Sequence, residues 1–73
     1  MIRMLVLGRH SDGSIEFYYQ DGEFYYVDLK GRKYKGYVKR VTKKYVIVVF
    51  ETERYRSRVY FDRKYLEKHG FRA

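Results

Sequence analysis

Lysine, arginine and tyrosine side chains alternate in two segments of the second half of the chain. Because alternate residues of a strand point to the same face, each segment would present one row of basic and aromatic groups. One row holds Lys35, Tyr37, Lys39 and Val41, and the other holds Arg54, Arg56, Arg58 and Tyr60. Lysine and arginine neutralise phosphates, and tyrosine rings stack on bases or sugars or wedge at a base step. The pattern predicts a nucleic-acid surface if neighbouring strands bring the two rows side by side.

A second basic segment, Lys30–Gly36, contains two glycines that would let the backbone approach a phosphate. It lacks the spacing of a phosphate-cradling loop, and a flexible turn explains it equally well. The full set of predicted nucleic-acid-binding residues is Arg32, Lys33, Lys35, Tyr37, Lys39, Arg40, Val41, Thr42, Arg54, Arg56, Arg58 and Tyr60.

Solubility is the alternative explanation for these basic groups, since positive residues also guard sheet edges against aggregation. Surfaces selected for solubility alone intersperse both signs of charge. Arg54, Arg56 and Arg58 have no acidic neighbour on their own face. We therefore favour binding over solubility.

Charge is unevenly distributed along the chain. Residues 1–29 carry two basic and five acidic side chains, a net charge of −3, whereas residues 30–73 carry fifteen basic and four acidic ones, a net charge of +11. Such a concentration suits a polyanionic partner, nucleic acid ahead of an anionic membrane. The apolar opening, residues 1–8, is too short for a signal sequence or a membrane span. We expect a cytoplasmic protein without a membrane partner, associated with the nucleoid if the polyanion is DNA.

Residues suited to catalysis or metal binding are few. His10, Asp12 and Glu16 form the one N-terminal cluster with acid–base potential, His69 stands alone, and cysteine is absent. The histidines lack metal-ligand spacing and the serines lack a recognisable nucleophile context. We expect no enzymatic activity, no metal and no cofactor, with a small nuclease that uses His10 as the remaining catalytic alternative.

Runs of Val, Ile, Tyr and Phe between short Gly, Asp and Lys punctuation predict strands joined by tight turns. The expected strands are Ile2–Leu7, Ile15–Gln20, Glu23–Leu29, Tyr34–Thr42, Tyr45–Thr52 and Arg56–Phe61. Asp21-Gly22 is a strong hairpin signal. The continuously apolar run Tyr45–Phe50 is typical of a strand covered on both faces, at the centre of the core or partly at a subunit contact.

Alternation also predicts the faces of the first hairpin. The core face would carry Ile15, Phe17 and Tyr19, matched on the partner strand by Tyr25, Val27 and Leu29. The opposite face would then expose three aromatic side chains, Tyr18, Phe24 and Tyr26. Such a surface could take a protein partner.

Helix signals follow the last strand. Asp62 can cap the N-terminus, with Phe61 and Leu66 as a hydrophobic staple, and Gly70 suits a left-handed ending with Phe71 folded back on Leu66. The sequence therefore predicts one domain over residues 1–73. Its fold class is mainly β, a small SH3-like antiparallel barrel or sheet of five to six strands with a short C-terminal helix.

The order of these elements resembles the seven-kilodalton crenarchaeal chromatin proteins. The residues that carry the resemblance are Glu16–Asp28, Val38–Thr42, Tyr45–Thr52 and Arg56–Val59. It implies a triple-stranded sheet on the DNA minor groove, with Val41 and Thr42 in the region that wedges a base step and Arg56, Arg58 and Val59 on the facing strand. It also implies an archaeal source, and the abundant charges without asparagine are typical of thermophiles.

The function predicted from these observations is largely sequence-independent nucleic-acid binding, with duplex DNA preferred over RNA. An assembly module, such as a viral or ribosome-associated accessory factor, is the alternative. It would self-associate through Tyr45–Phe50 or through Phe24 and Tyr26, which leaves a homodimer open.

Overall fold

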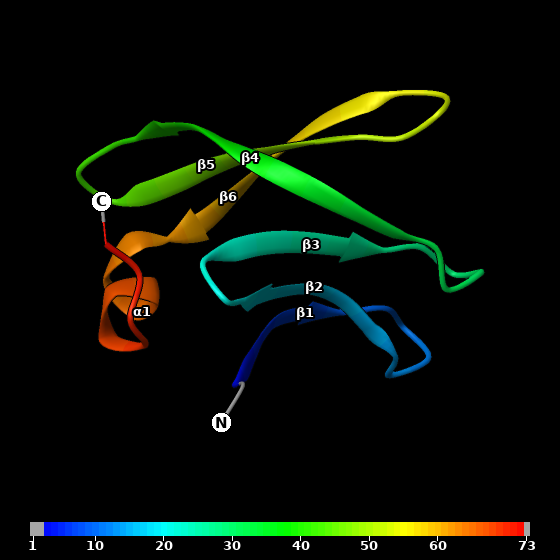
Figure 1. The fold of residues 1–73 in the computed structure, drawn as a ribbon, viewed down its shortest axis with the longest axis horizontal. Coiled ribbons are helices and arrows are strands. Elements are labelled where there is room, and N and C mark those ends of the chain that lie inside the picture. The colour runs from blue at the N-terminus through cyan, green and yellow to red at the C-terminus, as the bar shows by residue number, and fades with distance from the viewer. Residues whose placement is uncertain (1–2, 73) are drawn as a thin grey trace.

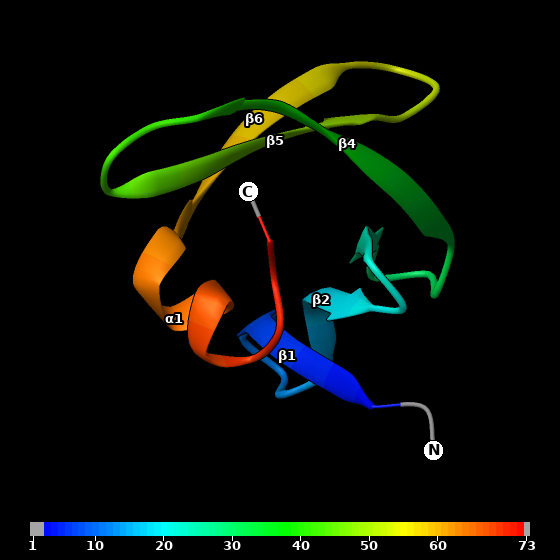
Figure 2. The ribbon, with the colours of Figure 1, turned by 60° about the vertical axis from the view of Figure 1, so that its left-hand side comes forward.

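Six antiparallel strands and one short helix make up the fold in the computed structural model, which describes residues 3–72. The strands follow one another in a single meander of order β1 to β6, and the sheet curls into a half-barrel (Figures 1 and 2). The elements are β1 Met4–Arg9, β2 Ile15–Gln20, β3 Glu23–Val27, β4 Lys33–Val41, β5 Tyr45–Glu51, β6 Arg56–Asp62 and α1 Arg63–Lys68. The predicted fold class is confirmed. The first strand lies two residues later than predicted, and Ile2, its predicted start, lies outside the described residues.

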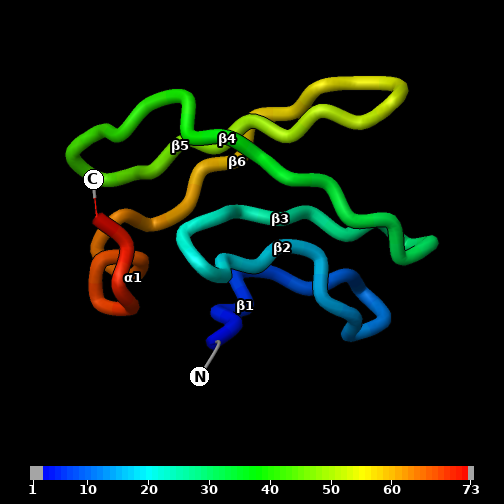
Figure 3. The backbone as a smooth tube through the Cα atoms, in the orientation of Figure 1, coloured from blue at the N-terminus to red at the C-terminus, as the bar shows by residue number. Residues whose placement is uncertain are grey.

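The long strand β4 joins the two halves of the sheet. Its first part, residues 33–36, pairs with β3, and its second part, residues 37–41, pairs with β5. The backbone trace passes from one half to the other without a break (Figure 3). Between the halves, the curl encloses the core.

The β2–β3 hairpin turns at Asp21-Gly22 as predicted. Both turn residues have positive φ, 53° and 80°, which is the conformation of a type I′ turn. A two-residue turn pairs Gln20 with Glu23. Odd-numbered residues of β2 therefore face even-numbered residues of β3.

This parity makes the predicted faces of the hairpin wrong on β3. Phe17 lies opposite Tyr26 and Tyr19 opposite Phe24, so Phe24 and Tyr26 turn inward. Phe24 is only 2% exposed and belongs to the core cluster, and Tyr26 packs against that cluster. Leu29, predicted on the core face, lies beyond β3 and is 75% exposed.

Tyr18 does lie on the outer face, but it is not exposed as predicted. Its ring stacks on Tyr25, its cross-strand partner, with 4.9 Å between centroids and 24° between planes. Val6 is its partner on the other side. Only 5% of Tyr18 remains exposed, so neither Tyr18 nor Phe24 is free for a partner.

The centre of the core is β5, whose residues Val46–Phe50 are all buried. Val46, Val48 and Phe50 point inward and pack with Phe24 and Phe61 in one cluster. The prediction of a strand covered on both faces is confirmed for Val46–Phe50, whereas Tyr45, the predicted start of the run, is 45% exposed. Because both edges of β5 are paired, to β4 and to β6, its backbone has no open edge for another chain.

Helix α1 begins and ends as its sequence signals predict. The Asp62 side chain accepts a hydrogen bond from the Tyr65 amide at 3.1 Å. At the other end Gly70 has φ 102°, and the amides of Gly70 and Phe71 donate to the carbonyls of Glu67 and Leu66, the two bonds of a Schellman ending. Leu66 and Phe71 thereby join the core, and α1 lies at the open side of the half-barrel (Figure 2).

Candidate nucleic-acid interface

The outer faces of β4, β5 and β6 form one three-stranded surface, which we call the basic face. Its cations come from β4 and β6, on either side of the apolar strand β5, and its tyrosines come from all three strands. The basic face consists of Tyr37, Lys39, Arg40, Tyr45, Ile47, Val49, Glu51, Arg56, Arg58, Tyr60 and Asp62, placed by the strand register. Part of each predicted row therefore lies on one face, Tyr37 and Lys39 on β4 and Arg56, Arg58 and Tyr60 on β6. The two parts are not adjacent, because β5 separates them.

A β-bulge in β4 adds a cation to this face. Val38 pairs with Val48 and Arg40 with Ile47, so Lys39 and Arg40 together oppose Ile47. A bulge re-aims side chains in this way. Lys39 accordingly lines a shallow depression with Val49, Arg56 and Arg58.

The middle of the basic face is apolar and covered. Ile47 and Val49 point outward from β5, yet they are only 7% and 2% exposed. Their cross-strand neighbours on both sides are long side chains, Arg40 and Tyr60 for Ile47 and Tyr37 and Arg58 for Val49. We attribute the burial to the stems and rings of these neighbours, because long charged side chains cover apolar surface while their heads stay in water.

Two side-chain contacts order the face. Arg56 donates a hydrogen bond from Nη2 to the Tyr37 hydroxyl at 3.2 Å, across the width of β5. Tyr45 and Tyr60 pack edge to face with 5.7 Å between ring centroids. Despite these contacts, about half of each tyrosine remains exposed to solvent, 46% of Tyr37 and 53% of Tyr60.

The electrostatics of the basic face are dominated by positive charge. Its charged side chains are Lys39, Arg40, Arg56 and Arg58 against two carboxylates, Glu51 and Asp62, and Asp62 is engaged as the cap of α1. Within residues 3–72 the ion pairs involve other side chains and none of these four cations. Their charge is therefore free to act on a polyanion.

Three predicted cations lie away from this face and are engaged with other groups. Arg32 pairs with Glu53 at 3.0 Å, and Lys35 pairs with Glu23 at 3.3 Å. Lys33 stands over the Tyr25 ring, 5.1 Å from its centroid. Lys35 shares the outer side of β4 with Tyr37 but sits where β4 pairs with β3.

Val41, Thr42 and Arg54, which were also predicted to bind, lie apart from the basic face. Val41 pairs with Val46 and packs against the core, because the bulge shifts the alternation by one residue. Thr42 closes the β4–β5 turn, where its hydroxyl accepts from the Tyr45 amide at 2.9 Å. Arg54 belongs to the β5–β6 turn and precedes β6.

The acid–base cluster near the N-terminus is occupied by structural contacts. His10 Nε2 donates to the Val27 carbonyl at 2.7 Å, and Nδ1 lies 3.7 Å from Glu16. The Asp12 carboxylate accepts from the amide and the hydroxyl of Ser14 at 2.9 and 2.6 Å, and these bonds lower its pKa. Among residues 3–72 no three His, Asp or Glu side chains are grouped as metal ligands.

Two features of the basic face escaped prediction from the sequence. The continuously apolar segment Tyr45–Phe50 predicts that Ile47 and Val49 lie in the core. Only the strand register shows that they form the middle of an outer surface. The bulge has no signal in Lys39-Arg40 either. The alternation of Lys35, Tyr37 and Lys39 was the one usable clue to this side of β4.

Comparison of the chain with models of protein families, with curated proteins and with solved structures found no match in any of the three. Over residues 3–72, no helix has the length and apolar character needed to cross a membrane.

Proposed function

We propose that this protein binds nucleic acid through the basic face, with duplex DNA preferred over RNA and with little dependence on sequence. The observation that carries the proposal is the layout of that face. Four cations without ion pairs among residues 3–72 flank a covered apolar strand, and exposed tyrosines lie between them.

The spacing of the strands supports contact with both sides of a groove. Neighbouring strands lie about 4.8 Å apart, so β4 and β6 are roughly 10 Å apart across β5. The minor groove of B-DNA is about 6 Å wide. Arg40 on β4 and Arg58 on β6 have long side chains. They can therefore reach phosphates of the two DNA strands on either side of the minor groove while β5 lies over it.

The side chains of the face favour phosphate and sugar contacts. Asparagine, which reads adenine through two hydrogen bonds, does not occur in the chain, and the single glutamine, Gln20, lies on β2. Arginine and lysine can neutralise phosphates in any sequence, and tyrosine rings can pack on sugars. This composition supports binding that depends on backbone shape and charge.

Salt dependence of duplex binding tests the proposal. Each phosphate neutralised lowers the slope of log K against log salt by about 0.9 on B-DNA, so four contacts predict a slope of about −3.6. Fluorescence anisotropy with a labelled blunt duplex measures it. Binding that does not change with salt would contradict the proposal.

Charge-removing variants locate the contacts. Arg40→Gln and Arg58→Gln should each make the slope shallower by about 0.9, whatever the duplex sequence. Lys64→Gln on α1 removes one charge from an exposed position away from the face and should leave the slope nearly unchanged. Equal effects of all three variants would mean that only net charge matters.

A further inference from the structure

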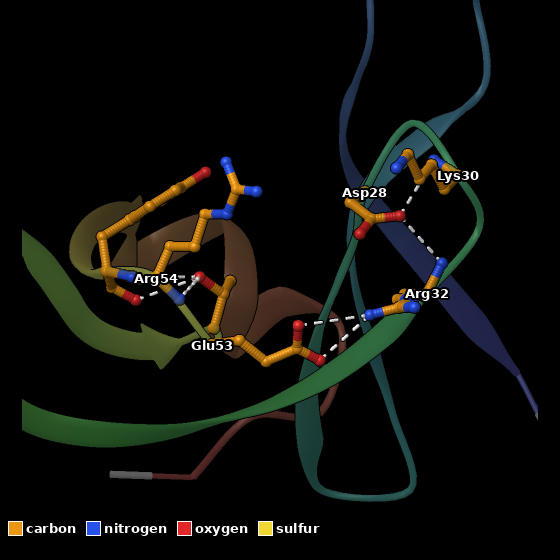
Figure 4. A network of polar contacts seen from close by, with 7 residues as sticks. Asp28, Lys30, Arg32, Glu53 and Arg54 are labelled. Atoms are coloured by element: carbon orange, nitrogen blue, oxygen red, sulfur yellow. Dashed lines mark hydrogen bonds and ion pairs between the residues drawn. The ribbon is translucent and has the colours of Figure 1, made fainter.

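A groove opens at the end of the half-barrel where the β3–β4 loop and the β5–β6 turn approach each other (Figure 4). Its volume is about 850 Å³, within the range of ligand-binding clefts. Three tyrosines line it, Tyr26, Tyr34 and Tyr55, although nothing in the sequence groups them. The predicted nucleic-acid surface did not include them.

The tyrosines supply flat rings for stacking. Tyr26 and Tyr34 are cross-strand partners whose rings stack with 6.0 Å between centroids and 28° between planes. Tyr55 stands on the β5–β6 turn and is 60% exposed. Aromatic rings in such a groove bind planar groups, and every nucleobase has such a face.

Charge in the groove is arranged in two layers. The half-buried part of the lining carries Glu16 and Asp28, while the exposed rim carries three cations, Lys30, Arg32 and Arg54, and one carboxylate, Glu53. Partial burial, and then the neighbouring Tyr55, Glu16 and Asp28, raise the pKa of Tyr26, as expected for a ring beside carboxylates. The groove therefore has an acidic, aromatic floor beneath a basic rim.

The rim is held in place by contacts that leave two cations available. One Asp28 oxygen accepts from the amides of Lys30 and Arg32, each at 2.9 Å, and Arg32 bridges to Glu53 on the opposite turn (Figure 4). Within residues 3–72 the ion pairs include neither Lys30 nor Arg54. These two cations can meet a phosphate.

We propose that the groove binds one unpaired nucleotide of a strand whose duplex part lies on the basic face. The base lies against the tyrosine rings, its hydrogen-bond donors meet the floor carboxylates, and its phosphate meets Arg54 and Lys30. The proposal rests on the proposed function, because it extends the same nucleic acid beyond that face. Only Tyr55 separates Arg54, on the groove, from Arg56, on the face.

The chemistry of the floor favours guanine. Guanine presents two neighbouring donors, N1–H and the 2-amino group, which match the two oxygens of one carboxylate. Thymine presents a single N–H between two carbonyls, and these carbonyls would face Glu16 and Asp28 with like partial charge. A cationic side chain of a protein would suit the floor equally, but the basic rim would repel the chain that carries it.

The test compares a blunt duplex with the same duplex carrying a one-nucleotide overhang of guanine or of thymine. Stacking of one base predicts roughly tenfold tighter binding of the guanine overhang than of the blunt duplex, and a smaller gain for thymine. Tyr55→Ala should abolish the gain and leave blunt-duplex affinity unchanged, and Tyr55→Phe should keep it. Tyr65→Ala, which removes an exposed ring on α1, is the matched control.

Glu16→Gln should reduce the preference for guanine over thymine while thermal unfolding verifies that the variant folds. Salt-dependent binding of the blunt duplex without any gain from an overhang would overturn this proposal alone. Failure to bind both the blunt duplex and the duplexes with an overhang would overturn this proposal and the proposed function together. Binding of acetyl-Gly-Arg-Gly-amide that Tyr55→Ala abolishes would assign the groove to a cationic protein partner and overturn the nucleotide assignment.

Discussion

Gly36 is the residue on which the junction of the two sheet halves most depends. A Cβ atom at this position would lie 2.5 Å from the Phe50 ring and 2.8 Å from Val48. Both neighbours are buried in the core, so neither can move aside. The absence of a side chain at Gly36 leaves room for the Phe50 ring and a Val48 methyl group.

Gly36→Ala should therefore lower the free energy of unfolding by about 1–3 kcal/mol, the usual cost of overpacking. Chemical denaturation measures this loss. In the double variant with Phe50→Leu, the smaller leucine side chain should relieve part of the clash. The losses of the two single variants should therefore add up to more than the loss measured for the double variant. Unchanged stability of Gly36→Ala would mean that the Phe50 and Val48 side chains do not approach Gly36 so closely.

Asp12 makes a pH-dependent contribution at the β1–β2 turn. Hydrogen bonds from Ser14 lower its pKa below the ordinary value of 3.8, so the folded state favours the carboxylate. The stabilisation is then present above 3.8 and is lost as the pH falls through the lower pKa of the folded state.

Asp12→Ala should accordingly be less stable than the wild type at neutral pH, and the difference should shrink when both are unfolded well below pH 3.8. Thermal unfolding across this pH range gives the comparison. A difference that stays constant with pH would contradict the role assigned to the carboxylate.

At the scale of elements, helix α1 depends on its two ends because it spans only six residues, Arg63–Lys68. Isolated helices of this length are not stable in water, so caps and the docking of Leu66 and Phe71 hold it in place. The Asp62 cap and the Gly70 ending are local features with well-defined residue preferences. Both were predictable from the sequence for that reason.

Asp62→Ala should cost about 0.5–2 kcal/mol of folding stability, since it removes the acceptor for the Tyr65 amide. Asp62→Asn keeps an acceptor oxygen and should retain most of that stability. Denaturation midpoints of the three proteins provide the test, and equal losses in both variants would show that the charge, and not the cap, matters.

For β3 and β4, the sequence predicted a strand but not which of its side chains face the core. The Asp21-Gly22 turn was evident, yet the faces of β3 depended on the parity with which a two-residue turn pairs Phe17 with Tyr26. The Lys39-Arg40 bulge, which moves Val41 to the core side and Arg40 outward, arises from the packing of β4 against β5. Long-range register of this kind has no local signature, so the candidate site was predicted in composition and only partly in geometry.

At the scale of the whole molecule, the fold converts a charge asymmetry along the chain into one in space. The strands β1 to β3 belong to the acidic first part of the sequence, and the free cations of the basic face belong to β4 and β6. Because β4 is shared by both halves, the outer face of β4–β6 is held rigidly against the core. An ordered surface of this kind is suited to a stiff partner such as a duplex.

A footprint of duplex DNA on the protein tests this central claim most directly. Amide chemical shifts, followed by NMR during titration with a blunt duplex, should change most in residues 37–40, 45–49 and 56–60, and little in β1 and β2. The largest changes in residues 4–20, with the amides of β4–β6 unaffected, would contradict the account.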